Sequence, residues 1–334
     1  MIKLGRVDRG GTRNLVCAFA ASLALFAGLD VAAMEGPRID AFAKAVAKKH
    51  KLDLQSVRDL LANGRRDNRV IEAYKRPAES KPWHAYRKIF LTEKRTKQGL
   101  AFWAKHEALL ARAEKKYGVP ASIIVAIIGV ETFYGVYTGK IRVIDALMTL
   151  AFHDPKREKF FRRELEEFLL LSTEGSINPL QIKGSYAGAM GIPQFISSSY
   201  RAYSVDFDND GVRDLSGSVA DAIGSVGAYL SRHGWRRGGV ITGRATITNA
   251  SAKAIVKKGY KPHMKLSQLQ SQGVRGLEGV AADAKASLVA LDGQDGKEYW
   301  IALRNFYAIT RYNHSPLYAM AVTQLSREIE AAKQ

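Results

Sequence analysis

The stretch Pro120–Glu131, which reads PASIIVAIIGVE, constrains the fold of this chain most. Proline is favoured in the first turn of a helix, so Pro120 marks a helix start. The residues from Ile123 to Val130 are apolar on nearly every side of that helix. A helix without a polar face has no side to turn toward water, so other elements have to enclose it. We therefore expect this helix at the centre of a mainly helical core.

The remaining chain supplies further helices and one small β region. Apolar residues recur at helical spacing over 39–63, and further helices are expected over 97–117, 144–152, 155–171, 219–233 and 318–333. Segment 68–82 is polar and contains Pro77 and Pro82, which predicts an extended connector. Strands are expected over 240–247, 287–291 and 298–303, with a turn over 292–296. The predicted fold class is mainly α (α+β), with a small β subdomain.

The N-terminus has the pattern of a secretory signal peptide. An apolar run over 15–29 and the small residues Val31-Ala32-Ala33 follow a basic start formed by Lys3, Arg6, Arg9 and Arg13. This order predicts removal of residues 1–33, whereas a membrane anchor, the alternative, would need about 20 apolar residues. The only cysteine, Cys17, lies in this segment, so the mature chain would suit an oxidising compartment. We expect a periplasmic protein, soluble or peripherally associated with the cell wall.

The charge balance points to an anionic partner. The chain has 51 Lys and Arg residues against 32 Asp and Glu residues, a net charge of +19, and removal of residues 1–33 would leave +17. Nucleic acid, an anionic membrane and an acidic polymer would all attract such a chain. Export argues against nucleic acid, and the sequence contains no zinc finger or RNA-binding signature. We therefore expect no nucleic acid partner and favour an anionic envelope polymer or membrane surface.

Glu131 stands at the C-terminal end of the apolar helix. Apolar surroundings and the negative end of the helix dipole both disfavour a carboxylate, so Glu131 is expected to keep its proton near neutral pH. A carboxylic acid in that state is suited to general acid catalysis. The alternative is a glutamate that pairs with a basic residue or turns to solvent beyond the helix end. The sequence pattern alone leaves both interpretations open.

Four blocks of sequence narrow this choice. They are a block over 117–147 that contains Gly-Val-Glu-Thr, GSYAGAMGIPQF over 184–195, DAIGSV over 221–226 and TRYN over 310–313. In these blocks and their order the chain resembles the membrane-bound lytic murein transglycosylase B family. The resemblance implies a lysozyme-like catalytic fold. It also implies cleavage of the β-1,4 bond between N-acetylmuramic acid and N-acetylglucosamine in peptidoglycan, with formation of 1,6-anhydromuramic acid. Hydrolysis of the same bond, or peptidoglycan binding without catalysis, is the alternative.

The resemblance also implies roles for individual residues. Glu131 would be the single general acid/base, because the 6-hydroxyl of the sugar replaces a second catalytic carboxylate. Substrate contacts are implied for a polar and aromatic set, namely Ser185, Gln194, Tyr229, Tyr312, Asn313, Tyr318 and, by spacing, Tyr86. Aromatic rings stack on sugars, and amides pair with hydroxyl and N-acetyl groups. For Tyr229 and Tyr318 the alternative is a position in the core or at its rim.

A basic pair, Lys156 and Arg157, matches one that this family places near the groove, where it would meet carboxylates of the peptide stem. A solvated helix face is the alternative for both residues. The expected partners are peptidoglycan glycan strands, with envelope protein complexes as a further class. We expect a monomer.

Residues Asp206–Asp214 match the first nine positions of an EF-hand loop, with Gly211 at position 6. Position 12 is Gly217, where such a loop has a bidentate glutamate. The resemblance implies that an acid further on completes the site, which gives Asp206, Asp208, Asp210, the carbonyl of Val212 and Asp221 as ligands. The alternative is a solvated turn. We expect structural Ca²⁺ or Na⁺ here and no cofactor for the chemistry.

These interpretations divide the chain into five parts. A signal peptide over 1–33 precedes a helical N-terminal region over 34–120. A lysozyme-like catalytic core over 121–239 contains the cation loop at 206–221. A small β-containing insertion over 240–303 is followed by a helical part over 304–334, which completes the groove.

Overall fold

The computed structural model describes residues 23–75, 80–153 and 157–334. The chain divides into two compact units, and the boundary between them in the sequence falls between Arg58 and Asp59. Residues 1–22 of the predicted signal peptide lie outside the described residues. Across the described ranges, no helix combines the length and the apolar character that crossing a bilayer requires.

The first unit contains helix α1 (Leu23–His50) and the beginning of helix α2 (Leu54–Ala62). Lys51 separates the two helices with a left-handed backbone φ of 56°. The apolar spacing predicted over 39–63 is confirmed, because Val46 and Val57 are buried. Arg58 also forms an ion pair with Asp40 of α1 at 2.7 Å, which joins the two helices within this unit.

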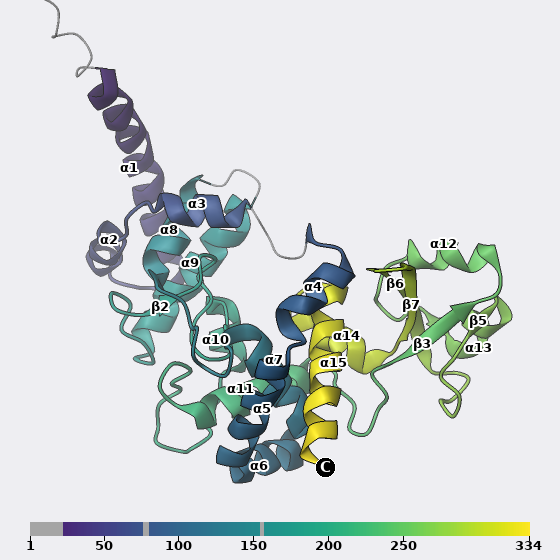
Figure 1. The fold of residues 1–334 in the computed structure, drawn as a ribbon. Helices are drawn as coiled ribbons and strands as arrows, with labels where there is room; N and C mark the ends of the chain where they lie inside the picture. The colour runs from purple at the N-terminus through teal and green to yellow at the C-terminus, as the bar shows by residue number, and fades with distance from the viewer. Residues whose placement is uncertain (1–22, 76–79, 154–156) are drawn as a thin grey trace, which may run out of the picture. The chain divides into compact units, whose positions relative to one another are not determined.

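The second unit is built around the apolar helix α7 (Ala121–Thr132), which contacts α5, α6, α11 and α15 (Figure 1). Every residue of α7 except Glu131 is buried, so the predicted central position is confirmed. The Glu114 carboxylate accepts a hydrogen bond from the Ala121 amide at 2.9 Å and thereby caps the start of α7. The other principal helices are α4 (Trp83–Phe90), α5 (Glu93–Lys105), α6 (Glu107–Tyr117), α8 (Val143–His153), α9 (Glu158–Thr173), α10 (Ser197–Tyr203), α11 (Val219–Arg232), α14 (Arg304–Tyr312) and α15 (Pro316–Lys333).

Two of the segments predicted from the sequence are wrong. The segment 68–82, predicted as a connector, begins with helix α3 (Asn68–Tyr74), whose N-terminus is capped by the Asp67 side chain. The predicted helix over 97–117 is interrupted at His106, which leaves helical geometry at φ −120° and separates α5 from α6. The His106 ring packs on Phe102 with 4.7 Å between ring centroids, a contact that periodicity does not reveal.

The β subdomain is an antiparallel sheet with strand order β4-β6-β7-β3-β5. The predicted strands are confirmed as β3 (Thr242–Ile247), β6 (Lys285–Gly293) and β7 (Gly296–Ala302). The edge strands β4 (Met264–Lys265) and β5 (Val274–Arg275) are only two residues long, too short to give an alternation pattern. Helices α12 (Lys253–Val256) and α13 (Leu266–Ser271) contact β6 and contribute to a separate apolar core.

A second, two-stranded sheet pairs β1 (Ile141–Arg142) with β2 (Lys183–Gly184). This pairing connects the segment that follows α7 to the segment that contains Ser185. The overall class is mainly α with a small β subdomain, as the sequence predicts.

Candidate active site

Glu131 is the one residue of α7 that is not buried, and it lies at the last turn of the helix. The Tyr318 hydroxyl, from the first turn of α15, donates a hydrogen bond to Glu131 Oε1 at 2.6 Å. Tyr318 is 1% exposed, so this hydrogen bond forms at the edge of the core. The structure therefore gives Glu131 a carboxyl group that a buried hydroxyl orients.

Next to Glu131, the rings of three tyrosines pack one against the next in the order Tyr318, Tyr312 and Tyr229. We call this row the tyrosine ladder. The rings of Tyr318 and Tyr312 stack with 6.3 Å between centroids and 10° between planes, and Tyr312 lies 4.8 Å from Tyr229. Burial, together with the nearby Glu131, raises the pKa of both Tyr312 and Tyr318 well above the usual value. Both hydroxyls therefore stay protonated and act as donors.

Two hydroxyls of the tyrosine ladder, those of Tyr312 and Tyr229, donate hydrogen bonds to backbone carbonyls. Tyr312 donates to the Pro193 carbonyl at 2.7 Å, and Tyr229 donates to the Arg311 carbonyl. The Tyr229 ring also stacks on the ring of His233, the residue that follows the end of α11, with 4.0 Å between ring centroids. His233 was absent from the sequence prediction, although its i, i+4 spacing from Tyr229 is a signal that would have found it.

The turn that follows Glu131 is strained. Phe133 and Tyr134 adopt left-handed φ values of 51° and 63°, which costs about 1–3 kcal/mol for each non-glycine residue. Arg95 of α5 stabilises this turn and so offsets part of the cost. Its Nε donates to the Gly129 carbonyl at 3.1 Å, and its guanidinium lies 5.2 Å from the Phe133 ring centre. The Tyr134 hydroxyl donates in return to the Arg95 carbonyl at 2.8 Å. Arg95 was also missed, because nothing in the sequence connects α5 to the end of α7.

Ser185 and Gln194 lie on one folded-back loop, 184–195, in which the Ser185 amide donates to the Ala189 carbonyl at 2.9 Å. Ser185 Oγ accepts hydrogen bonds from the Ala187 and Ala189 amides at 3.3 and 3.1 Å. Gln194 has a left-handed φ of 53°, and its side-chain amide donates to the carbonyls of Thr138 and Gly191 at 3.0 and 2.8 Å. Backbone contacts thus hold both side chains in fixed positions.

Hydrogen bonds connect this loop to α7 next to Glu131. Thr132 Oγ1 donates to the Ile192 carbonyl at 2.8 Å and accepts from the Gly135 amide at 3.0 Å. The next carbonyl, that of Pro193, accepts from Tyr312. The residues predicted on the loop are therefore joined to the Glu131–Tyr318–Tyr312 group through two backbone carbonyls.

The remaining predicted residues lie around this group. Tyr86, in α4, is buried and close enough to Tyr318 to contribute to its raised pKa. Asn313 ends α14 directly after Tyr312. Arg157 lies at the start of α9, with its guanidinium 4.2 Å from the centre of the Phe160 ring. Burial lowers the pKa of His314, and the charges of Arg311 and Arg157 lower it further. Lys156 lies outside the described residues.

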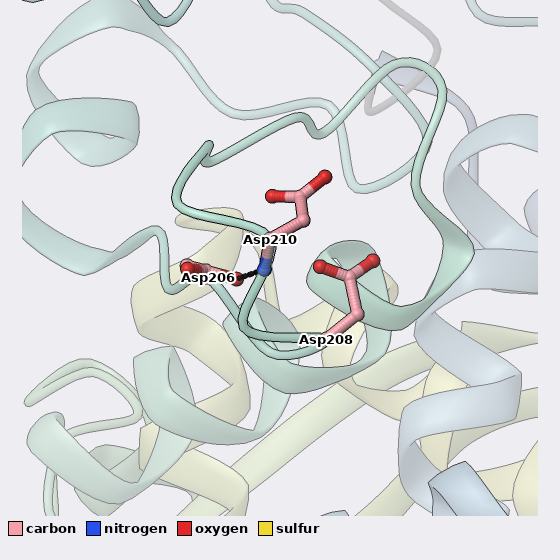
Figure 2. Close-up of side chains that lie close together, drawn as sticks. All are labelled: Asp206, Asp208 and Asp210. Carbon is pink, nitrogen blue, oxygen red and sulfur yellow. Dashed lines mark hydrogen bonds between the residues drawn. The ribbon is translucent and has the colours of Figure 1, made fainter.

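The predicted cation loop places three carboxylates around one point. Asp206, Asp208 and Asp210 each offer an oxygen, and these oxygens lie within 4.8 Å of one another (Figure 2). Asp206 accepts from the Asn209, Asp210 and Gly211 amides at 2.7, 3.2 and 2.9 Å, which curls the loop. Carboxylate oxygens in a flexible loop are ligands that Ca²⁺ prefers, so this donor set fits a hard cation.

Asp221 lies outside that group of three acids. It is fully buried in the first turn of α11, where Oδ1 accepts from the Phe207 amide at 2.6 Å and Oδ2 accepts from the Asp214 amide at 2.7 Å. Burial raises the pKa of Asp221 despite these two hydrogen bonds. In this structure the Asp221 carboxylate therefore connects the two ends of the loop, at Phe207 and Asp214, by hydrogen bonds.

The chain matches known proteins over nearly its whole length. A family profile described as "Transglycosylase SLT domain" matches residues 35–327. The chain is 41% identical over 307 residues to "Membrane-bound lytic murein transglycosylase B" of Escherichia coli (strain K12), which covers 89% of this chain and 84% of that protein. This chain belongs to the lytic murein transglycosylase B family.

Solved structures extend this relation to the fold. Soluble lytic transglycosylase SltB1 from Pseudomonas aeruginosa superposes with a TM-score of 0.83 at 47% identity, covering 89% of this chain and 99% of that one. The Escherichia coli lytic transglycosylase Slt35, in a complex with calcium, gives a TM-score of 0.78 at 40% identity, with coverage of 89% and 94%. The helical catalytic part of this lytic murein transglycosylase B family member is thus lysozyme-like.

Proposed function

We propose that Glu131 is the single general acid/base with which this chain cleaves peptidoglycan as a lytic transglycosylase. The substrate bond is the β-1,4 link between N-acetylmuramic acid and N-acetylglucosamine. The observation that carries the proposal is the hydrogen bond from Tyr318 to Glu131 at 2.6 Å, at the end of a helix that is otherwise entirely buried. A carboxyl group with one side in the core and an oriented neighbour is the arrangement that acid catalysis needs.

In the first step Glu131 donates its proton to the glycosidic oxygen, and the bond from that oxygen to C1 of N-acetylmuramic acid breaks. The electron pair leaves with N-acetylglucosamine, and the muramic ring develops oxocarbenium character. In the second step the Glu131 carboxylate takes the proton of the 6-hydroxyl as O6 bonds to C1. The 1,6-anhydro ring forms, Glu131 regains its proton, and no water is consumed.

Tyr318 serves this cycle as an orienting donor. Its high pKa keeps the hydroxyl protonated, so the hydrogen bond supports Glu131 when the carboxyl group is ionised. The loop carbonyls of Ile192 and Pro193 position Ser185 and Gln194, which we assign to hydrogen bonds with the sugars. Tyr86, Tyr229, Tyr312 and Asn313 are assigned to the walls of the glycan groove.

The deciding experiment is mass analysis of muropeptides released from purified sacculi by the wild type and by Glu131→Gln. The wild type should release 1,6-anhydro products, which are lighter by one water than reducing ends. Glu131→Gln should lower turnover by at least about a thousandfold, because both proton transfers depend on this group. Release of reducing ends alone would assign hydrolysis instead, and binding of sacculi without turnover by the wild type would assign a non-catalytic role. Unchanged turnover by Glu131→Gln would reject Glu131.

We also propose that loop 206–214 holds a structural Ca²⁺. Asp206, Asp208 and Asp210 would supply carboxylate ligands, with the Val212 carbonyl beside them. We do not include Asp221 among the direct ligands, because both of its carboxylate oxygens accept hydrogen bonds from backbone amides. The ion would neutralise mutual repulsion of the loop acids and would take no part in bond cleavage.

We further propose that the chain is exported to the periplasm with removal of residues 1–33. The basic, apolar and small-residue segments of the N-terminus support this step. Intact mass measurement of the protein from an envelope fraction should give a chain that starts at Met34. A full-length chain starting at Met1 would contradict the proposed removal.

A further inference from the structure

Helix α4 has one side that packs near the proposed catalytic residues and another side that faces the β subdomain. The helix contacts α15, which carries Tyr318, and it also contacts β6 of the β subdomain (Figure 1). On the β-subdomain side lies a pocket of about 460 Å³. Its lining is formed by His84, Arg87 and Lys88 of α4, Arg244 of β3, and the β6–β7 hairpin from Gly293 to Glu298.

The pocket has an excess of positive charge. Its cationic side chains are Arg87, Lys88, Arg244 and Lys297, and its acids are Asp295 and Glu298. Glu298 is already paired with Arg244 at 2.6 Å, and Lys297 is paired with Asp292. Within the described part of the chain, neither Arg87 nor Lys88 takes part in an ion pair. These two charges are therefore available to an anionic ligand.

Aromatic rings and a backbone contact hold the pocket walls in place. The Arg87 guanidinium lies 5.6 Å from the ring centre of Trp83, which is fully buried, and Arg244 lies 5.2 Å from the Trp300 ring. His84 Nδ1 lies 3.3 Å from the Asp292 carbonyl, which connects α4 to the end of β6. Since cations that pack on aromatic faces lose less freedom on binding, the site is partly preorganised.

The pocket lies within reach of a substituent on the glycan. Helix α4 carries Tyr86, which lies near Tyr318, as well as the pocket residues His84, Arg87 and Lys88, and a helix with its side chains is about 10–12 Å across. An extended peptide spans about 3.3–3.6 Å per residue, so three to five residues bridge that distance. A pentapeptide stem, such as the one in the NAG-NAM-pentapeptide complex of SltB3 from Pseudomonas aeruginosa, has this length and ends in a carboxylate.

We propose that this pocket binds a carboxylate of the peptide stem on the strand being cleaved, and so favours stem-bearing glycan over bare glycan. The proposal rests on the function proposed above and makes Arg87 and Lys88 determinants of substrate specificity. Both act at a distance from the reacting bond, so they contribute to KM and leave kcat unchanged.

The test compares two substrates, soluble glycan strands that carry stems and the same strands after an amidase has removed them. The double variant Arg87→Gln/Lys88→Gln should raise KM for stem-bearing strands about tenfold, since hydrogen bonds to charged groups contribute about that much. The KM for bare strands should stay within about twofold of the wild type. The matched control is Lys257→Gln/Lys258→Gln, which removes two exposed charges from the β subdomain outside the pocket.

Several outcomes would overturn the proposal. Equal changes of KM on both substrates, or the same selective change in the control, would show a general charge effect. Loss of binding to phosphatidylglycerol vesicles with an unchanged KM would assign the pocket to lipid. If the double variant fails to fold, Lys88→Glu gives a second test, because Lys88 is exposed, and it should show the same stem-selective loss. Glu131→Gln separates the two proposals, because its inactivity on both substrates tests the function and not the pocket.

Discussion

The end of helix α7 and the loop 206–214 place the same functional group, a carboxyl, in different surroundings. At the helix end one carboxyl, that of Glu131, meets a buried tyrosine that arrives from a distant part of the chain. In the loop three carboxylates, those of Asp206, Asp208 and Asp210, gather near one another and accept mostly local backbone amides. A lone acid with apolar neighbours is suited to proton transfer, whereas exposed acids that lie close together are suited to a cation.

Among the variants that leave Glu131 in place, the largest effect is expected from Tyr318→Phe, which removes the hydroxyl and keeps the ring. Without the donor to Glu131 Oε1, the carboxyl group is less well oriented and its ionised state less well stabilised. We expect kcat to fall by about 10–100-fold with KM nearly unchanged. Tyr307→Phe in α14 is the matched control and should retain wild-type kcat. A wild-type kcat for Tyr318→Phe would remove this hydrogen bond from the catalytic description.

The second effect concerns the buried acid beside the loop. Asp221→Ala leaves the Phe207 and Asp214 amides without their acceptor, which should lower the free energy of unfolding by about 2–3 kcal/mol. The control Asp210→Ala removes an exposed acid that accepts from the nearby Val212 amide, and it should change stability by less than about 0.5 kcal/mol. Urea unfolding with a chelator present measures both values. Equal losses would mean that Asp221 is no more important to the fold than the exposed acids.

A smaller effect is expected from calcium. Saturating Ca²⁺ should raise the melting temperature by about 2–5 °C, because an ion that binds only the folded state stabilises it. Asp208→Asn/Asp210→Asn should abolish this increase, whereas Asp283→Asn, an exposed acid in the β subdomain, should retain it. Turnover at a fixed temperature below unfolding should not depend on the ion. An unchanged melting temperature of the wild type would favour a solvated turn.

The smallest effect is expected at Glu164, a buried acid to which we assign no catalytic role. Glu164 is 1% exposed, and burial raises its pKa despite hydrogen bonds from the Ser198 amide and hydroxyl, both at 2.9 Å. A raised pKa in the folded state means that ionisation destabilises the fold as pH rises above the unfolded-state value. Glu164→Gln avoids this ionisation, so its melting temperature relative to the wild type should increase from about pH 4 to about pH 7. A difference that is constant with pH would show that Glu164 is not penalised by burial, and turnover should be unaffected throughout.

Much of the fold follows from local pattern. The apolar character of Ile123–Val130 requires an enclosed helix, and the short apolar run Ser287–Leu291 followed by an Asp-Gly turn predicts the β6–β7 hairpin; both are present. The break at His106 and the helix over Asn68–Tyr74 involve single side-chain contacts, and the break at Lys51 involves one left-handed backbone conformation. Periodicity averages out such single-residue features. The edge strands are too short to carry any pattern.

The candidate site divides in the same way. The position of Glu131 at the end of an apolar helix, and the loop acids at EF-hand spacing, are visible in the sequence. The partners Arg95 and His233, and the use of Asp221 as a tie between loop ends, are not. Each depends on which surfaces pack together.

The sequence by itself determined that a mainly helical core encloses one helix and that this helix ends in an acid. It also determined that a short β region follows, because periodicity and turn residues act over a few positions. Only the tertiary structure decided which hydroxyl meets the acid, since Tyr318 lies 187 residues after Glu131. It likewise decided that α4 contacts α15, which carries Tyr318, and contributes to a basic pocket together with β3 and the β6–β7 hairpin. Such contacts are set by the packing of whole elements, and local sequence carries no record of that packing.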